Sequence, residues 1–165
     1  MKEIKRDVYL NKLISRKENG LIKVITGIRR CGKSYLLDPL FKNHLLESNV
    51  KEDHIIKIEL DKEENKKYRD SHELNEYIKS QIKDKNMYYI LLDEIQMVEG
   101  FESVLNSFLY GRNLDVYVTG SNSKFLSSDI ITEFRGRGDE IKVFPLSFSE
   151  YMESFKGDKQ DAWNE

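Results

Sequence analysis

The chain has 165 residues, of which 39% are hydrophobic and 34% are charged, and its formal net charge is −2, as in a globular domain with its own core. No apolar run approaches the roughly 20 residues that a membrane span requires and no signal peptide is visible, so we expect a cytoplasmic protein without a membrane segment. A single cysteine, Cys31, excludes an intramolecular disulfide and suits a reducing compartment.

The first part of the chain predicts a helix, a strand and a second helix. Apolar residues recur at helical spacing over 6–17, and the break at 18–20 precedes a short β-branched segment, 21–26, that is typical of a buried strand. A helix is expected over about 33–47. Pro39 lies inside it and removes a backbone hydrogen bond, so we expect a kink there.

Strands and helices alternate through the rest of the chain. Four further strands are expected, at 55–60, 87–92, 115–119 and 140–144. Helices are expected around 74–82, 101–109 and 123–134, and the charged segment 61–70 is expected to be an exposed connection. This alternation predicts an α/β domain with a central, mostly parallel five-stranded sheet flanked by helices. We expect an N-terminal helix and lead-in over 1–20, a core over 21–150 and a C-terminal extension over 151–165.

Residues 27–34, Gly-Ile-Arg-Arg-Cys-Gly-Lys-Ser, form a complete G-x-x-x-x-G-K-[ST] phosphate-binding loop between the first strand and the second helix. The glycines allow successive N–H groups to point inward around the α- and β-phosphates, and the start of the helix adds positive potential. We expect Lys33, at the surface of the loop, to reach the β/γ-phosphates, and the Ser34 hydroxyl to bind Mg²⁺. The residues expected to contact nucleotide are Gly27, Ile28, Arg29, Arg30, Cys31, Gly32, Lys33, Ser34 and Tyr35.

Asp93 and Glu94 follow the apolar strand 87–92, which is a Walker B pattern. The carboxyl end of a parallel strand would place Asp93 beside the phosphate loop, where it can hold Mg²⁺. Glu94 would then orient and deprotonate the attacking water.

Polar residues also follow the strand 115–119. If that strand lies between the loop strand and the Asp-Glu strand, Ser121 or Asn122 points toward the γ-phosphate and can bind it or the attacking water. Alternatively, Asn122 or Ser123 caps the following helix.

Arg137 stands between two glycines, Gly136 and Gly138, in a turn that would project it from the surface. Its planar, permanently charged guanidinium suits the stabilisation of phosphoryl-transfer charge. The competing interpretation is an exposed polar turn.

Positive charge is concentrated at the start of the chain. Residues 1–35 contain ten Lys or Arg and three Asp or Glu, a local excess of seven. Part of this charge would serve the phosphate site. The remainder would be either a solvated basic face or a surface for DNA or a protein partner.

These motifs occur in an order that resembles the ATPase domain of a widespread prokaryotic family of AAA+-like predicted ATPases. The resemblance runs from about Arg6 to Tyr151 and rests on the phosphate loop, Leu-Leu-Asp-Glu-Ile-Gln (91–96), Thr-Gly-Ser-Asn-Ser (119–123), Gly-Arg (136–137) and Phe-Pro-Leu-Ser-Phe-Ser-Glu (144–150). It implies ATP with Mg²⁺, Glu94 as the base, a polar sensor at 121–122 and a match of Arg137 to the family's Gly-Arg element. It also implies a further C-terminal region, winged-helix or nuclease-like, which this sequence does not include.

The sequence therefore favours Mg²⁺-dependent ATP hydrolysis coupled to a conformational change. A kinase would need an acceptor pocket and a lid, and a GTPase would favour an Asn-Lys-x-Asp signature, which is absent. The alternative is a nucleotide-gated module that binds DNA or protein with little hydrolysis. Trp163 lies near the end of the sequence, which suggests that a further element covers this large aromatic side chain. We therefore expect the isolated chain to hydrolyse ATP slowly and Arg137 to act in a neighbouring subunit or after rearrangement. The competing interpretation is a helix over 147–163 that docks Trp163 on this domain.

Overall fold

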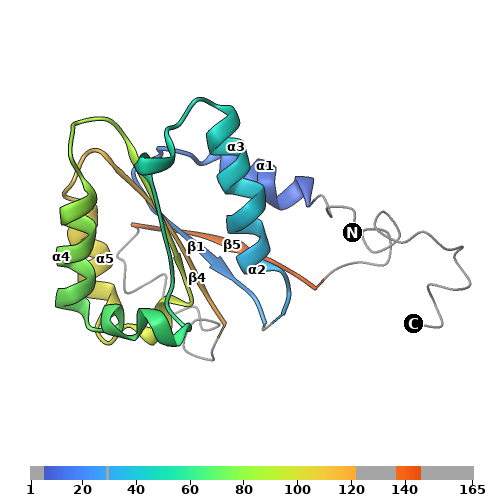
Figure 1. The fold of residues 1–165 in the computed structure, drawn as a ribbon. Helices are drawn as coiled ribbons and strands as arrows, with labels where there is room; N and C mark the ends of the chain where they lie inside the picture. The colour runs from blue at the N-terminus through green and yellow to red at the C-terminus, as the bar shows by residue number, and fades with distance from the viewer. Residues whose placement is uncertain (1–5, 29, 122–136, 146–165) are drawn as a thin grey trace, which may run out of the picture.

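A computed structural model describes residues 6–28, 30–121 and 137–145, and it shows a sheet between two layers of helices (Figure 1). The sheet has five strands in the order β2-β3-β4-β1-β5, and every neighbouring pair is parallel. The strands are β1 (Ile22–Thr26), β2 (Ile55–Glu59), β3 (Tyr88–Asp93), β4 (Leu114–Gly120) and β5 (Gly138–Lys142). The predicted α/β class and five-stranded parallel sheet are confirmed.

Helices pack against both faces of this sheet. One face contacts α1 (Asp7–Ser15), α2 (Lys33–Tyr35) and α3 (Lys42–Glu47), and the other contacts α4 (Ser71–Gln81) and α5 (Phe101–Phe108). Short 3-10 turns occupy connections at Glu52–His54, Glu63–Arg69 and Ile95–Met97. Within the described ranges, no helix combines the length and the apolar character needed to cross a lipid bilayer.

Two hydrophobic cores result, because alternate residues of each strand point to opposite faces. Along β1, Ile22 and Val24 enter the core beneath α4 and α5, whereas Ile25 enters the core beneath α1 to α3. Ile90 and Leu91 of β3 divide in the same way. Both faces of the central strands are therefore buried, which explains their continuous apolar runs.

The predicted kink at Pro39 is confirmed. Between α2 and α3 the chain forms a wide turn, Leu36–Phe41, in which Asp38 leaves the helical region at φ −146° and ψ 118°. Proline disfavours helical backbone in the residue before it, so the interruption falls at Asp38. Leu36, Leu37 and Phe41 remain buried on either side, and the helix direction is re-established in α3.

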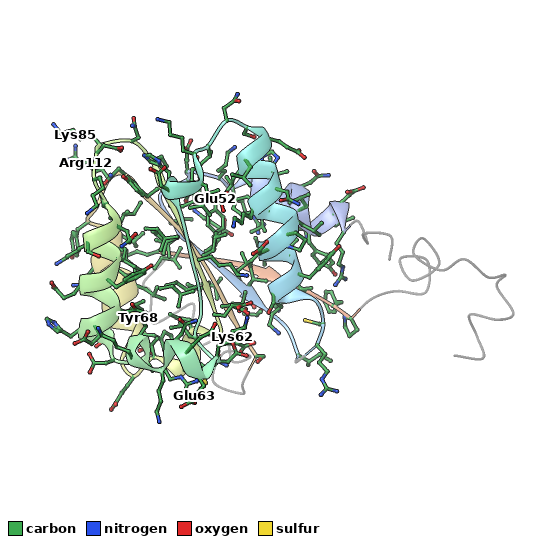
Figure 2. All side chains as sticks on the ribbon, viewed as in Figure 1. Glu52, Lys62, Glu63, Tyr68, Lys85 and Arg112 are labelled. Atoms are coloured by element: carbon green, nitrogen blue, oxygen red, sulfur yellow. The ribbon has the colours of Figure 1, made fainter. Side chains whose placement is uncertain are left out.

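Two connections refine the expectations. Residues 61–70 are mostly exposed, as predicted, but Glu63–Arg69 forms 3-10 turns. Figure 2 shows Glu63 toward the lower end of the molecule. The last strand occupies Gly138–Lys142 rather than 140–144. This edge strand contains charged residues, and its limits are set by its pairing with β1. The prediction from sequence followed the apolar residues Val143 and Phe144 and therefore placed the strand two residues too late.

Candidate functional site

The carboxyl ends of three adjacent strands meet at one edge of the sheet. β1 leads into the phosphate loop, β3 ends at Asp93, and β4 leads to Ser121. β4 lies between β1 and β3, which is the arrangement required for a polar residue after β4 to face the loop. In open parallel sheets, this edge is where ligands bind.

The phosphate loop is closely packed at both of its glycines. A Cβ on Gly27 would lie 2.5 Å from the Val143 carbonyl oxygen and 2.6 Å from the Cys31 Sγ. Gly32 has φ +95°, a left-handed conformation that only glycine adopts readily, and α2 begins directly after it. The loop therefore requires glycine at both positions for physical reasons.

Lys33 is buried, so the expectation that it lies at the surface of the loop is wrong. Its side chain donates to the carbonyl oxygens of Gly27 and Ile28, both at 2.8 Å, and the residue is 4% exposed. An ammonium group has three donors, and when it is buried each of them needs an acceptor in place of water. The two loop carbonyl groups supply such acceptors and so allow Lys33 to be buried. Lys33 thus crosses the interior of the loop and contacts its first two residues.

Ser34 and Asp93 are brought together as expected for a magnesium site. The Ser34 hydroxyl donates to Asp93 Oδ2 at 2.7 Å, and the Thr119 hydroxyl donates to Asp93 Oδ1. Burial raises the pKa of Asp93, and the two hydroxyl donors oppose that shift. Hydroxyl and carboxylate oxygens are ligands that Mg²⁺ prefers, so these residues fit the ion. In the described part of the chain, no group of three or more His, Cys, Asp or Glu could hold a metal ion by itself.

Glu94 is held in an unusual backbone conformation, with φ 58° and ψ 53°. Its N–H donates to the Thr119 hydroxyl at 2.9 Å, and its carboxylate accepts hydrogen bonds from Ser121 Oγ, at 2.8 Å, and from the Gln96 amide. Left-handed backbone is costly for a residue with a side chain and is concentrated at functional sites. The turn directs the Glu94 carboxylate toward the end of β4.

Sequence reasoning gave Thr119 and Gln96 no role in this site, although both stand in the motifs at 119–123 and 91–96. Thr119 is fully buried and joins Asp93 to Glu94 through one hydroxyl. The signal was present, because Thr119 ends an apolar strand that adjoins the Asp-Glu strand. Gln96 could have been recognised from its position two residues after Glu94 in a tight turn.

Arg137 lies at the opposite edge of the sheet. Its carbonyl accepts a hydrogen bond from Ile22 N, and Gly138 pairs with Ile22, so Arg137 stands at the amino ends of β1 and β5. Five residues of strand, at about 3.3 Å each, put roughly 15 Å between it and the phosphate edge. The fold does not bring Arg137 to the phosphate loop of its own chain.

Other predicted contacts differ in their exposure. Ile28 and Arg30 face solvent, whereas Cys31 is buried and Tyr35 packs against the core beneath α1 to α3. Arg29 and Asn122 lie outside the described residues, as do the predicted helix 123–134, Gly136, residues 146–150 of the Pro-Leu-Ser-Phe element, and the extension 151–165.

Known proteins resemble this chain in sequence and in fold. It is 35% identical to an uncharacterized protein of Haemophilus influenzae over 95% of the chain and 39% of that protein, and 36% identical to one of Methanocaldococcus jannaschii over 92% of the chain and 31% of that protein. The chain thus spans less than half the length of these curated relatives. The structure of AMPPCP-bound DnaA from Aquifex aeolicus shares its fold, with a TM-score of 0.59 and 16% identity over 99% of the chain and 56% of that structure.

The sequence profile of the AAA domain family matches residues 19–152, which include both the phosphate loop and the Asp-Glu strand. The match covers most of the chain, and the predicted resemblance to AAA+-like P-loop ATPase domains is confirmed. The chain belongs to the AAA domain family.

Proposed function

We propose that this domain binds ATP with Mg²⁺ and hydrolyses it, and that hydrolysis is coupled to a conformational change. The observation that carries the proposal is the continuous network that joins the phosphate loop to the ends of β3 and β4. Ser34 contacts Asp93, Asp93 contacts Thr119, and Thr119 contacts Glu94. A network that joins the predicted metal ligands to the predicted base supports catalysis more directly than phosphate binding alone.

Each residue has a role that its surroundings support. Loop N–H groups and Lys33 would bind the phosphates, and Ser34 and Asp93 would hold Mg²⁺, which neutralises charge on the β- and γ-phosphates when bound. Glu94 would accept a proton from the attacking water. Ser121 Oγ, which lies 2.8 Å from the Glu94 carboxylate, would hold that carboxylate in its orientation. Arg137 would contribute only to nucleotide held by another subunit.

The test is to measure ATP binding and phosphate release for wild type and Glu94→Gln. The variant keeps the shape of the side chain and loses the base, so we expect unchanged ATP affinity and a turnover lower by roughly 10²–10⁴-fold. Glu99→Gln is the matched control, because Glu99 is exposed just beyond the same turn and its variant removes the same charge. Equal turnover in wild type and Glu94→Gln would contradict the role of the base, and ATP binding without turnover in wild type would favour the nucleotide-gated module.

A further inference from the structure

The residue that precedes α1, Arg6, contacts the phosphate loop from outside. Its Nη1 donates to the Cys31 carbonyl oxygen at 2.6 Å, and its Nη2 donates to the Phe144 carbonyl oxygen at 2.8 Å. Arg6 is only 4% exposed, and its guanidinium lies 4.6 Å from the centre of the Tyr9 ring. The Tyr9 hydroxyl in turn accepts a hydrogen bond from Phe144 N at 3.1 Å. One cation therefore joins the loop to the chain that follows β5.

The contact at Cys31 fixes the direction of one loop peptide. In a trans peptide the C=O and the following N–H point in opposite directions. When the Cys31 carbonyl faces Arg6, the N–H of Gly32 faces the other way, toward the side of the loop opposite the guanidinium. The guanidinium also packs against Gly32, because a Cβ there would lie 3.0 Å from Arg6 Nη1.

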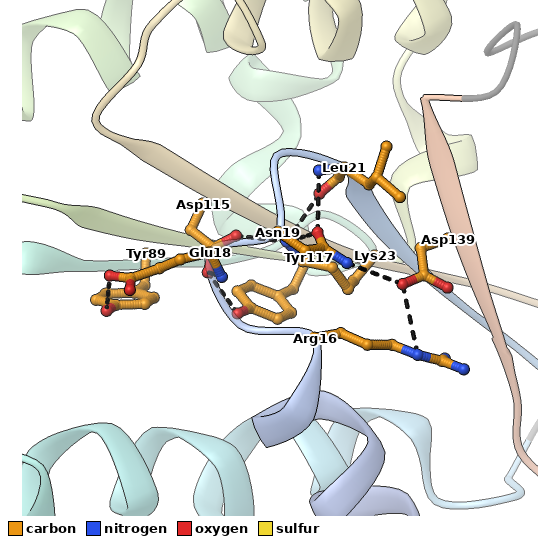
Figure 3. Close-up of polar contacts among 9 residues, drawn as sticks. All are labelled: Arg16, Glu18, Asn19, Leu21, Lys23, Tyr89, Asp115, Tyr117 and Asp139. Carbon is orange, nitrogen blue, oxygen red and sulfur yellow. Dashed lines mark hydrogen bonds and ion pairs between the residues drawn. The ribbon is translucent and has the colours of Figure 1, made fainter.

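The other end of α1 is fastened by a separate set of polar contacts (Figure 3). Arg16, the residue after the helix, pairs with Asp139 at 3.4 Å and donates to the Glu140 carbonyl oxygen at 3.3 Å, both in β5. Glu18 N donates to Asp115 at 2.9 Å, and the fully buried Lys23 bonds the same carboxylate.

Tyrosine hydroxyls complete this anchor (Figure 3). Tyr117 donates to Asp115 at 2.6 Å, and Tyr89 donates to Glu18 at 2.8 Å. Burial and the neighbouring carboxylates raise the pKa of both tyrosines, so both hydroxyls remain protonated donors. Because the residues that directly follow α1 are held by β3, β4 and β5, Arg6 occupies a defined position at the other end of the helix.

From this arrangement we infer that Arg6 is a positioning residue that sets the conformation of the phosphate-binding loop and links it to the segment after β5. The inference deepens the proposed function and rests on it, because it concerns the same phosphate site. The guanidinium is suited to this role, since its planar fork reaches two carbonyl groups at once, whereas a lysine ammonium is a point donor.

The experiment compares the full chain with Arg6→Gln and with Arg16→Gln, a matched loss of one guanidinium at the opposite end of α1. Calorimetry gives the affinity for Mg²⁺-ATP, and a thiol reagent without nucleotide gives the reactivity of Cys31, the single cysteine. Cys31 is 2% exposed, so its reaction reports opening of the loop. For Arg6→Gln we expect affinity to fall about 10- to 100-fold, which corresponds to one charge-assisted hydrogen bond, and thiol reaction to accelerate. Arg16→Gln should change both far less, because Glu18 N still bonds Asp115 and the Glu18 carboxylate still bonds Tyr89 at that end of the helix.

Arg6→Lys keeps the charge, so its ATP affinity and its rate of Cys31 reaction should lie between those of wild type and Arg6→Gln. If Arg6→Gln does not fold by circular dichroism, Arg6→Lys decides the matter, with an intermediate loss of affinity expected. Equal Cys31 reactivity and equal affinity in the Arg6 and Arg16 variants would overturn the role of Arg6. Absence of ATP binding in wild type would instead contradict the proposed function, while the thiol measurement, made without nucleotide, would still test whether Arg6 controls the loop.

Discussion

Thr119→Val tests whether one hydroxyl holds the candidate site together. Thr119 is completely buried, and its Oγ1 both donates to Asp93 Oδ1 and accepts from Glu94 N. Valine has nearly the same shape, so the variant removes these two hydrogen bonds and leaves the packing in place. The Asp93 carboxylate would keep its bond to Ser34, and Glu94 N would lose its bond to the Thr119 hydroxyl.

The magnitude follows from these contacts. A hydrogen bond to a charged carboxylate contributes about 1.5–3 kcal/mol to stability, and a neutral one contributes about 0.5–1.5 kcal/mol. A buried methyl group in place of the hydroxyl returns about 0.8 kcal/mol. We therefore expect the free energy of unfolding to fall by about 1–4 kcal/mol, and ATP turnover to fall because Glu94 loses its fixed backbone position.

Urea unfolding of Thr119→Val and Thr26→Val decides this prediction. Thr26 ends β1 at the same edge of the sheet, is 4% exposed, and makes one side-chain bond, 3.0 Å to Glu140. Glu140 is half-buried and regains water when that bond is lost, so Thr26→Val should cost less, about 1 kcal/mol. Equal losses of stability in the two variants, with turnover intact in Thr119→Val, would refute the reasoning.

Two further predictions concern other regions. If Arg137 acts only in another subunit, the specific activity of wild type rises with protein concentration, whereas that of Arg137→Ala stays flat; a fast, concentration-independent rate in both would contradict this. His54 is stacked on Tyr88, and its ring nitrogens bond Asp53 at 2.8 Å and Asp84 at 3.0 Å. Burial lowers the pKa of His54, but the two carboxylates outweigh burial, so the pKa is raised. The stability that wild type gains over His54→Gln should thus be full below about pH 6.5 and be lost as pH rises through the raised pKa, which urea unfolding across pH can measure; a difference that does not vary with pH would count against it.

Much of the fold could be predicted because the signals were local. The strands of the sheet interior are short apolar runs, the kink follows from Pro39, and the Asp-Glu pair directly follows a strand. The edge strand β5 was misplaced by two residues, because its charged residues carry little apolar pattern and its pairing with β1 decides its limits. Arg6 could not be identified, since it contacts Phe144, which is 138 positions away in the sequence.

Several basic residues of the first 35 positions are buried, so the excess of positive charge in this part of the sequence is not all available at the surface. Sequence alone left them as a solvated face or as a surface for DNA or protein. Arg6, Lys23 and Lys33 are at most 4% exposed, and each bonds acceptors within the domain. A buried cation without such acceptors would be severely destabilising, so these three charges serve the fold and the phosphate loop. Any partner that reads positive charge here would have to contact exposed residues such as Lys12 and Arg30, and Arg30 belongs to the phosphate loop itself. Binding at that position and nucleotide binding would therefore affect one another, because both act on the same short segment of backbone.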